Sequence, residues 1–104
     1  MAKFVLAYHG GGIAETEEEQ AEVMAAWGAW MEGLGSALKD PGNPSGARKT
    51  IAADGSVSDG GGANPVTGYS ILEAGSLDEA VTLAKSNPVF ASGGSIEVIE
   101  AIEM

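Results

Sequence analysis

The amino-acid sequence predicts a single α+β domain over residues 1–104, with two helices inserted between strands in the order β-α-β-β-α-β. Three observations support this fold class. Apolar side chains recur with a period of two near both ends of the chain, which is typical of strands. Two segments begin with a Ser/Thr-x-x-Glu capping box, which marks a helix start. Runs rich in glycine, proline and aspartate separate these segments, as turns do.

The first strand is expected over Lys3–His9, with Phe4, Leu6 and Tyr8 on one face and Val5, Ala7 and His9 on the other. Gly10, Gly11 and Gly12 then interrupt it. Thr16 and Glu19 form the first capping box, so a helix is predicted from about Glu17 to Leu38. Its apolar residues recur at three- and four-residue steps along one stripe: Val23, Trp27, Trp30, Met31, Leu34 and Leu38.

The middle of the chain is predicted to be mostly loops around a short strand. Asp40–Gly46 is dense in turn residues, Arg48–Ala53 is the expected second strand, and Asp54-Gly55 is a turn signal. The segment Ser58–Pro65 has the composition of a flexible linker. The third strand is expected over Gly68–Ala74.

A second helix is predicted from Leu77 to about Ser86, after the capping box of Ser76 and Glu79. Asn87-Pro88 ends it, and Ser95–Ile102 is the last strand. This order indicates a ferredoxin-like fold with a four-stranded antiparallel sheet. Helices would cover one face of the sheet, yet both faces carry apolar side chains. We therefore expect a homodimer in which two sheets meet face to face and close an α+β barrel.

The composition excludes several classes of protein. The chain has no cysteine, which rules out disulfides and thiolate metal sites. Its net charge of -10, from 15 acidic and 5 basic residues, argues against nucleic acid and anionic membranes as partners. The acidity suits a solvated surface, and the alternatives are an acidic partner face or adaptation to high salt. No segment resembles a membrane span or signal peptide, so a cytoplasmic location is expected.

His9, the single histidine, is the best catalytic candidate. It ends the first strand beside glycines, where a ligand can approach the backbone, and histidine is the usual acid or base near neutral pH. The alternative is a structural histidine bonded to a carbonyl. An acid–base histidine often pairs with a carboxylate, and the candidates are Asp40, Asp54 and Asp59. Each of these also fits a turn.

Tyr8, Trp27 and Tyr69 are candidate substrate-binding residues, although Trp27 with Trp30 also fits plain core packing. The glycine runs at 10–12 and 60–62 match no phosphate-binding motif. One histidine with scattered carboxylates makes no recognisable metal-ligand set. The sequence therefore predicts neither a metal nor a cofactor.

Several segments together resemble one family over essentially the whole chain. They are, in chain order, Lys3–Gly10, Val57–Gly60, Gly68–Ala74, Ser76–Ala80 and Gly94–Val98. In their order and spacing they resemble the YCII-related family, also called the DGPF-domain family. The resemblance implies a ferredoxin-like fold, a dimeric α+β barrel and a cleft between sheet and loops with a His-Asp pair, here His9 and Asp59.

The chain departs from the family at its defining motif, because Asp-Gly-Pro-Phe is replaced by Asp59-Gly60-Gly61-Gly62. Loss of the rigid proline and the aromatic ring implies an altered or more mobile pocket. The resemblance implies no settled activity, since proteins that share the barrel include small-molecule isomerases, lyases and haem-free oxygenases.

Two functions, and one purely structural reading, follow from these patterns. The first is a cofactor-free enzyme of isomerase or lyase type, in which His9 transfers a proton on a small organic molecule and Asp59 or Asp54 orients it. The second is a non-catalytic metabolite-binding or regulatory dimer. The third reading is a structural dimer in which His9 serves only packing.

Overall fold

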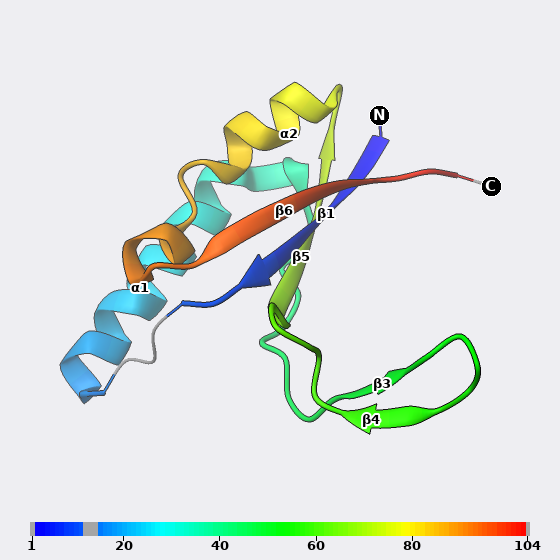
Figure 1. Ribbon diagram of the computed structural model, residues 1–104. Coiled ribbons are helices and arrows are strands. Elements are labelled where there is room, and N and C mark those ends of the chain that lie inside the picture. The colour runs from blue at the N-terminus through cyan, green and yellow to red at the C-terminus, as the bar shows by residue number, and fades with distance from the viewer. Residues whose placement is uncertain (1, 12–14, 104) are drawn as a thin grey trace.

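The structure, a computed structural model, describes residues 2–11 and 15–103 and shows an α+β fold in the order β-α-β-β-β-β-α-β. Four strands form one antiparallel sheet in the order β2-β5-β1-β6. They are β1 (Ala2–His9), β2 (Leu38–Asp40), β5 (Val66–Ala74) and β6 (Ser95–Ala101). The sheet class predicted from the sequence is confirmed, and within the described residues this sheet stays open rather than closing into a barrel (Figure 1).

Helices α1 (Glu17–Leu34) and α2 (Leu77–Ala84) pack against the same face of the sheet. Phe4, Leu6 and Tyr8 of β1 point into this core and are at most 6% exposed, as the alternation predicts. Both predicted caps are present: Thr16 Oγ1 accepts from the backbone of Glu19, and Ser76 Oγ from that of Glu79. The two capping boxes in the sequence therefore predicted the start of each helix correctly.

Helix α1 ends earlier than the apolar stripe predicts. Gly35 closes it with a φ of 55°, and its N–H donates to the carbonyl of Met31. A short 3-10 turn, η1 (Gly35–Ala37), leads into β2, where Leu38 pairs with Leu72. Leu38 is thus a strand residue, because glycine frees the backbone there and the edge of β5 supplies hydrogen-bond partners.

The prediction that Arg48–Ala53 is the second strand of the main sheet is wrong. Residues Lys49–Ile51 form β3, which pairs only with β4 (Val57–Asp59) in a separate two-stranded sheet. The Asp54-Gly55 turn that joins them is present, since Asp54 Oδ1 accepts from the backbone of Ser56. This hairpin uses the start of the segment predicted to be a flexible linker, and it projects away from the body (Figure 1).

The remaining boundaries differ by a few residues from those expected. Helix α2 ends at Ala84 instead of Ser86, and a 3-10 turn, η2 (Pro88–Ser92), precedes β6. Gly12 of the predicted glycine break lies outside the described residues. Among the helices that the structure describes, none has the length and apolar character needed to cross a membrane.

Candidate functional site

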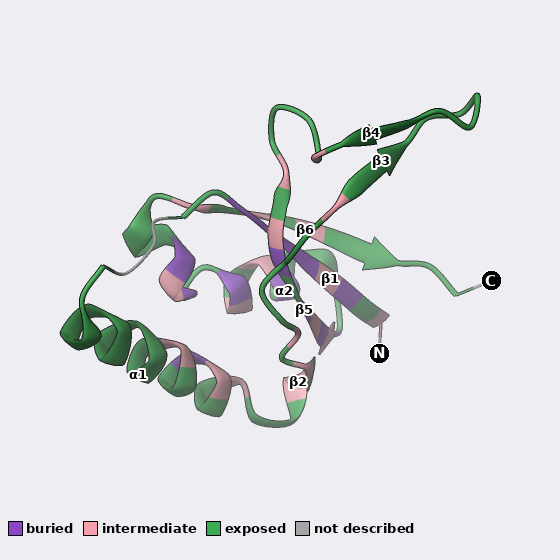
Figure 2. Cartoon of the chain, turned by 90° about the horizontal axis from the view of Figure 1, so that it is seen from below, coloured by how far each residue is buried: buried purple, intermediate pink, exposed green. Residues whose placement is uncertain are grey.

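The first half of α1 stands away from the sheet. Residues 15–26 are all exposed, whereas Trp27, Trp30, Met31 and Leu34 pack against the core (Figure 2). Trp30 holds the later part of the helix in place because its indole N–H donates to the carbonyl of Leu83, 3.2 Å away. A helix held at one end leaves a space between its other end and the sheet.

This space is a cavity of about 990 Å³ bounded by α1, the ends of β1 and β5, the loop after β2 and η2. Its lining residues are Tyr8, Gly10, Gly11, Glu22, Val23, Ala26, Trp27, Met31, Pro41, Gly42, Asn43, Pro44, Ser45, Thr67, Gly68, Tyr69, Pro88, Val89, Ala91 and Ser92. Glu22 is the one charged residue among them. An apolar space with a few polar groups is the usual character of a small-molecule site.

All three predicted substrate-binding residues border this cavity. The rings of Tyr8 and Trp27 meet edge to face, with centroids 5.3 Å apart, and Trp27 meets Trp30 in the same way at 5.8 Å. Trp27 is therefore at once a packing residue and part of the cavity wall. Tyr69 is the residue of β5 that borders the cavity beside the loop after β2.

Gly42 lets that loop approach β5 closely. It has a φ of 74°, and a Cβ atom at this position would lie 1.6 Å from the carbonyl oxygen of Tyr69. Asp40 Oδ1 accepts from the backbone N–H of Gly42, so Asp40 serves the turn. The cavity wall at this edge depends on this contact, and no larger residue fits there without displacing the backbone.

A buried chain of hydrogen bonds fixes Tyr8. Its hydroxyl donates to Ser70 Oγ at 2.7 Å and accepts from Asn87 Nδ2 at 3.3 Å. Ser70 Oγ in turn donates to the carbonyl of Pro41 at 2.8 Å. Sequence reasoning missed Ser70 and Asn87, although a small polar residue among the buried positions of β5 is a signal that a buried partner exists.

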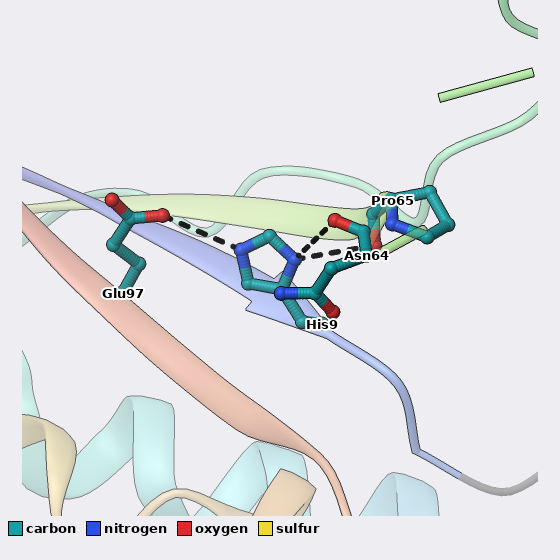
Figure 3. Close-up of polar contacts among 4 residues, drawn as sticks. All are labelled: His9, Asn64, Pro65 and Glu97. Carbon is teal, nitrogen blue, oxygen red and sulfur yellow. Dashed lines mark hydrogen bonds and ion pairs between the residues drawn. The ribbon is translucent and has the colours of Figure 1, made fainter. Parts of the chain in front are cut away.

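His9 lies on the opposite, helix-free face of the sheet, as Figure 3 shows. Its Nδ1 donates to the carbonyls of Asn64 and Pro65, at 3.1 and 3.3 Å. Because a carbonyl oxygen can only accept, Nδ1 carries a proton. The imidazole is thus held in one orientation by the segment that leads into β5.

The other ring nitrogen, Nε2, is buried and has no hydrogen bond. It lies 3.5 Å from Oε1 of Glu97, whose side chain is 66% exposed. The two carbonyls hold Nδ1, so Nε2 is the ring nitrogen that faces the carboxylate of Glu97. His9 is not among the residues that line the cavity.

The predicted pairing of His9 with an aspartate is replaced by proximity to Glu97. Asp59 instead binds Lys49 across the hairpin, while Asp40 and Asp54 accept hydrogen bonds within turns. Hydrogen bonds with Ser56 lower the pKa of Asp54. The pairing of β1 with β6 is the feature that brings Glu97 close to His9. Ala7 pairs with Glu97 and His9 pairs with Ser95, so Glu97 lies diagonally across from His9 on the neighbouring strand.

Comparison of the sequence with protein-family models and with curated proteins gives no match. The resemblance to the YCII-related family therefore stays a prediction. Among the described residues no group of three or more His, Cys, Asp or Glu side chains is arranged to hold a metal ion.

The buried Tyr8 predicts a stability loss at alkaline pH. Burial raises the pKa of its phenol, while the hydrogen bonds with Ser70 and Asn87 act in the opposite direction. An unfolded tyrosine titrates near pH 10, so the contribution of Tyr8 is complete below about pH 10 and is lost as the pH rises through the native pKa. We expect the free energy of unfolding in urea to fall with pH above about 10, and to fall less in Tyr8→Phe. Equal losses in the two proteins would contradict this origin.

Proposed function

We propose that the chain binds a small, largely apolar organic molecule without a negative charge in the cavity beside α1. The observation that carries the proposal is the lining: aromatic and aliphatic side chains with Glu22 as the one charged residue. Tyr8, Trp27 and Tyr69 are the proposed binding residues. The ring of Tyr8 is fixed by its hydrogen bonds, so this part of the site needs little ordering when a ligand binds.

The charge of the chain supports a ligand that carries no negative charge. The net charge is -10, and Glu22 adds a local negative charge at the cavity. Both features disfavour a ligand with a carboxylate or phosphate. Side chains of Asn43, Ser45 and Thr67 offer polar partners for a hydroxyl or carbonyl on an otherwise apolar ligand.

Membership of the YCII-related family and a dimeric ferredoxin-like barrel are parts of the same proposal. The strand order, with β5 between β2 and β1 and with β1 between β5 and β6, supports the ferredoxin-like assignment. The helix-free face supports a dimer, because it carries the partly exposed Val5 and Ile71 and the exposed Ile99. A second copy would cover these side chains and close the barrel.

A second candidate function is catalysis by His9, without a cofactor. The observation that favours it is the buried Nε2 atom, which has no hydrogen bond and lies beside Glu97. In this candidate His9 takes a proton from carbon at Nε2, and Glu97 stabilises the resulting imidazolium. Its substrate would lie on the helix-free face and not in the cavity.

Filling the cavity is expected to weaken ligand binding. We expect the neutral dye N-phenyl-1-naphthylamine to bind with enhanced fluorescence, and Ala26→Phe to weaken that binding about tenfold by displacing it from the apolar lining. Ala25→Phe is the matched control, because Ala25 is exposed on the same helix and does not line the cavity. The sulfonated analogue, 8-anilinonaphthalene-1-sulfonate, should bind more weakly. Equal binding to both variants would contradict the site.

Catalysis by His9 predicts proton exchange on a carbon acid. In D₂O the protein should speed exchange of the α-protons of phenylacetone, since His9 removes a proton to give the enolate and solvent deuterium replaces it. His9→Gln should lose this exchange, measured by NMR, while still binding the naphthylamine dye. Exchange that is unchanged in His9→Gln would exclude His9 as the base.

The proposed dimer is measured directly by light scattering. We expect a mass of twice the 10.4 kDa of the chain at micromolar concentration. The apolar side chains of the helix-free face supply the driving force, so the dimer should persist at high salt. A monomer mass under these conditions would exclude the barrel.

A further inference from the structure

The β3–β4 hairpin has no core of its own. Its strands pair with each other and not with the main sheet, and every residue of both strands is exposed. Ile51 is 72% exposed and Val57 is 59% exposed. A two-stranded hairpin alone is marginally stable in water at best, so this one needs further contacts to hold its shape.

The two faces of the hairpin differ in character. Ile51 pairs with Val57, and two residues along the same face Lys49 forms an ion pair with Asp59. Thr50 and Ser58 pair on the other face. The hairpin therefore presents one face with an apolar pair and one polar face, as a strand pair does when one side is covered.

The hairpin lies on the side of the sheet away from the helices. Figures 1 and 2 show α1 on one side of the sheet and the hairpin on the other. Its root is tied to the helix-free face, because the imidazole of His9 donates to the carbonyls of Asn64 and Pro65. The hairpin and the helix-free face, which is proposed to meet a second copy, are thus parts of one continuous surface.

Charge also favours a second copy of this chain as the partner. On the helix-free face the basic residues Lys3 and Lys39 stand beside three acidic residues, Asp40, Glu73 and Glu97, and Lys39 Nζ lies 3.6 Å from Glu73 Oε1. On and next to the hairpin the two basic residues Arg48 and Lys49 match the two acidic residues Asp54 and Asp59. In a chain of net charge -10 these are nearly balanced surfaces, so two copies can approach through them without strong repulsion.

We propose that the β3–β4 hairpin is a dimerisation arm that docks the face carrying Ile51 and Val57 onto a second copy of this chain. In a two-fold dimer each arm holds the other subunit, because an isologous interface repeats every contact. This inference rests on the dimer part of the proposed function. It adds that the contact extends beyond the sheet face to an arm that holds the partner from the side.

Paired asparagine substitutions test the arm while keeping its charge constant. Ile51→Asn/Val57→Asn changes the apolar face, and Thr50→Asn/Ser58→Asn is the matched control on the polar face of the same hairpin. The dimer dissociation constant of each full-length protein is measured by analytical ultracentrifugation, with thermal melting as a check on folding. Loss of two buried apolar side chains should weaken the dimer at least about tenfold in the first variant, and the control should stay within about twofold of the wild type.

The possible outcomes distinguish failure of the proposed arm from failure of the proposed dimer. A wild-type dimer with selective weakening in Ile51→Asn/Val57→Asn supports the proposal. A wild-type dimer that both variants retain equally overturns the arm and leaves the sheet-face dimer intact. Equal weakening in both variants also overturns the arm, because the apolar face would then contribute no more to the dimer than the polar face does. A monomeric wild type overturns the dimer and the arm together.

Discussion

The hydrogen bonds of the Tyr8 hydroxyl hold the cavity end of this fold together. Through Ser70 and Asn87 this one group joins β1 to β5 and to the start of η2, and Ser70 extends the link to Pro41 in the loop after β2. Asn87 Oδ1 also accepts from the backbone of Val89. Leaving any of these buried groups unpaired costs more than the bond itself contributes, so the four segments keep one arrangement.

The cavity is a consequence of where α1 is anchored. Its later turns pack through Trp27 and Trp30, and Trp30 also bonds the carbonyl of Leu83 near the end of α2. Its first turns carry Glu17, Glu18 and Glu19, which the helix dipole favours but which cannot be buried against a sheet. The acidic start thus keeps the helix away from the sheet, and the aromatic residues at its middle form the wall of the space that remains.

The two faces of the sheet serve different purposes. The helix-covered face holds the core and borders the cavity, whereas the other face carries His9, a nearly balanced set of charges and partly exposed apolar side chains such as Ile99. His9 connects this second face to the segment that follows the hairpin. Because Tyr8 and His9 are adjacent on β1, one strand contributes to the cavity on one face and to the proposed interface on the other.

The sequence alone determined the features that depend on near neighbours: the inward face of β1, the two helix caps, the turn at Asp54-Gly55 and the antiparallel α+β class. It also selected Tyr8, Trp27 and Tyr69, which border one cavity. Only the tertiary structure decided that Leu38–Asp40, and not Arg48–Ala53, extends the main sheet, and that Glu97 lies beside His9. The physical reason is distance along the chain, because a three-residue edge strand has little local signal and its partner is chosen by register and burial.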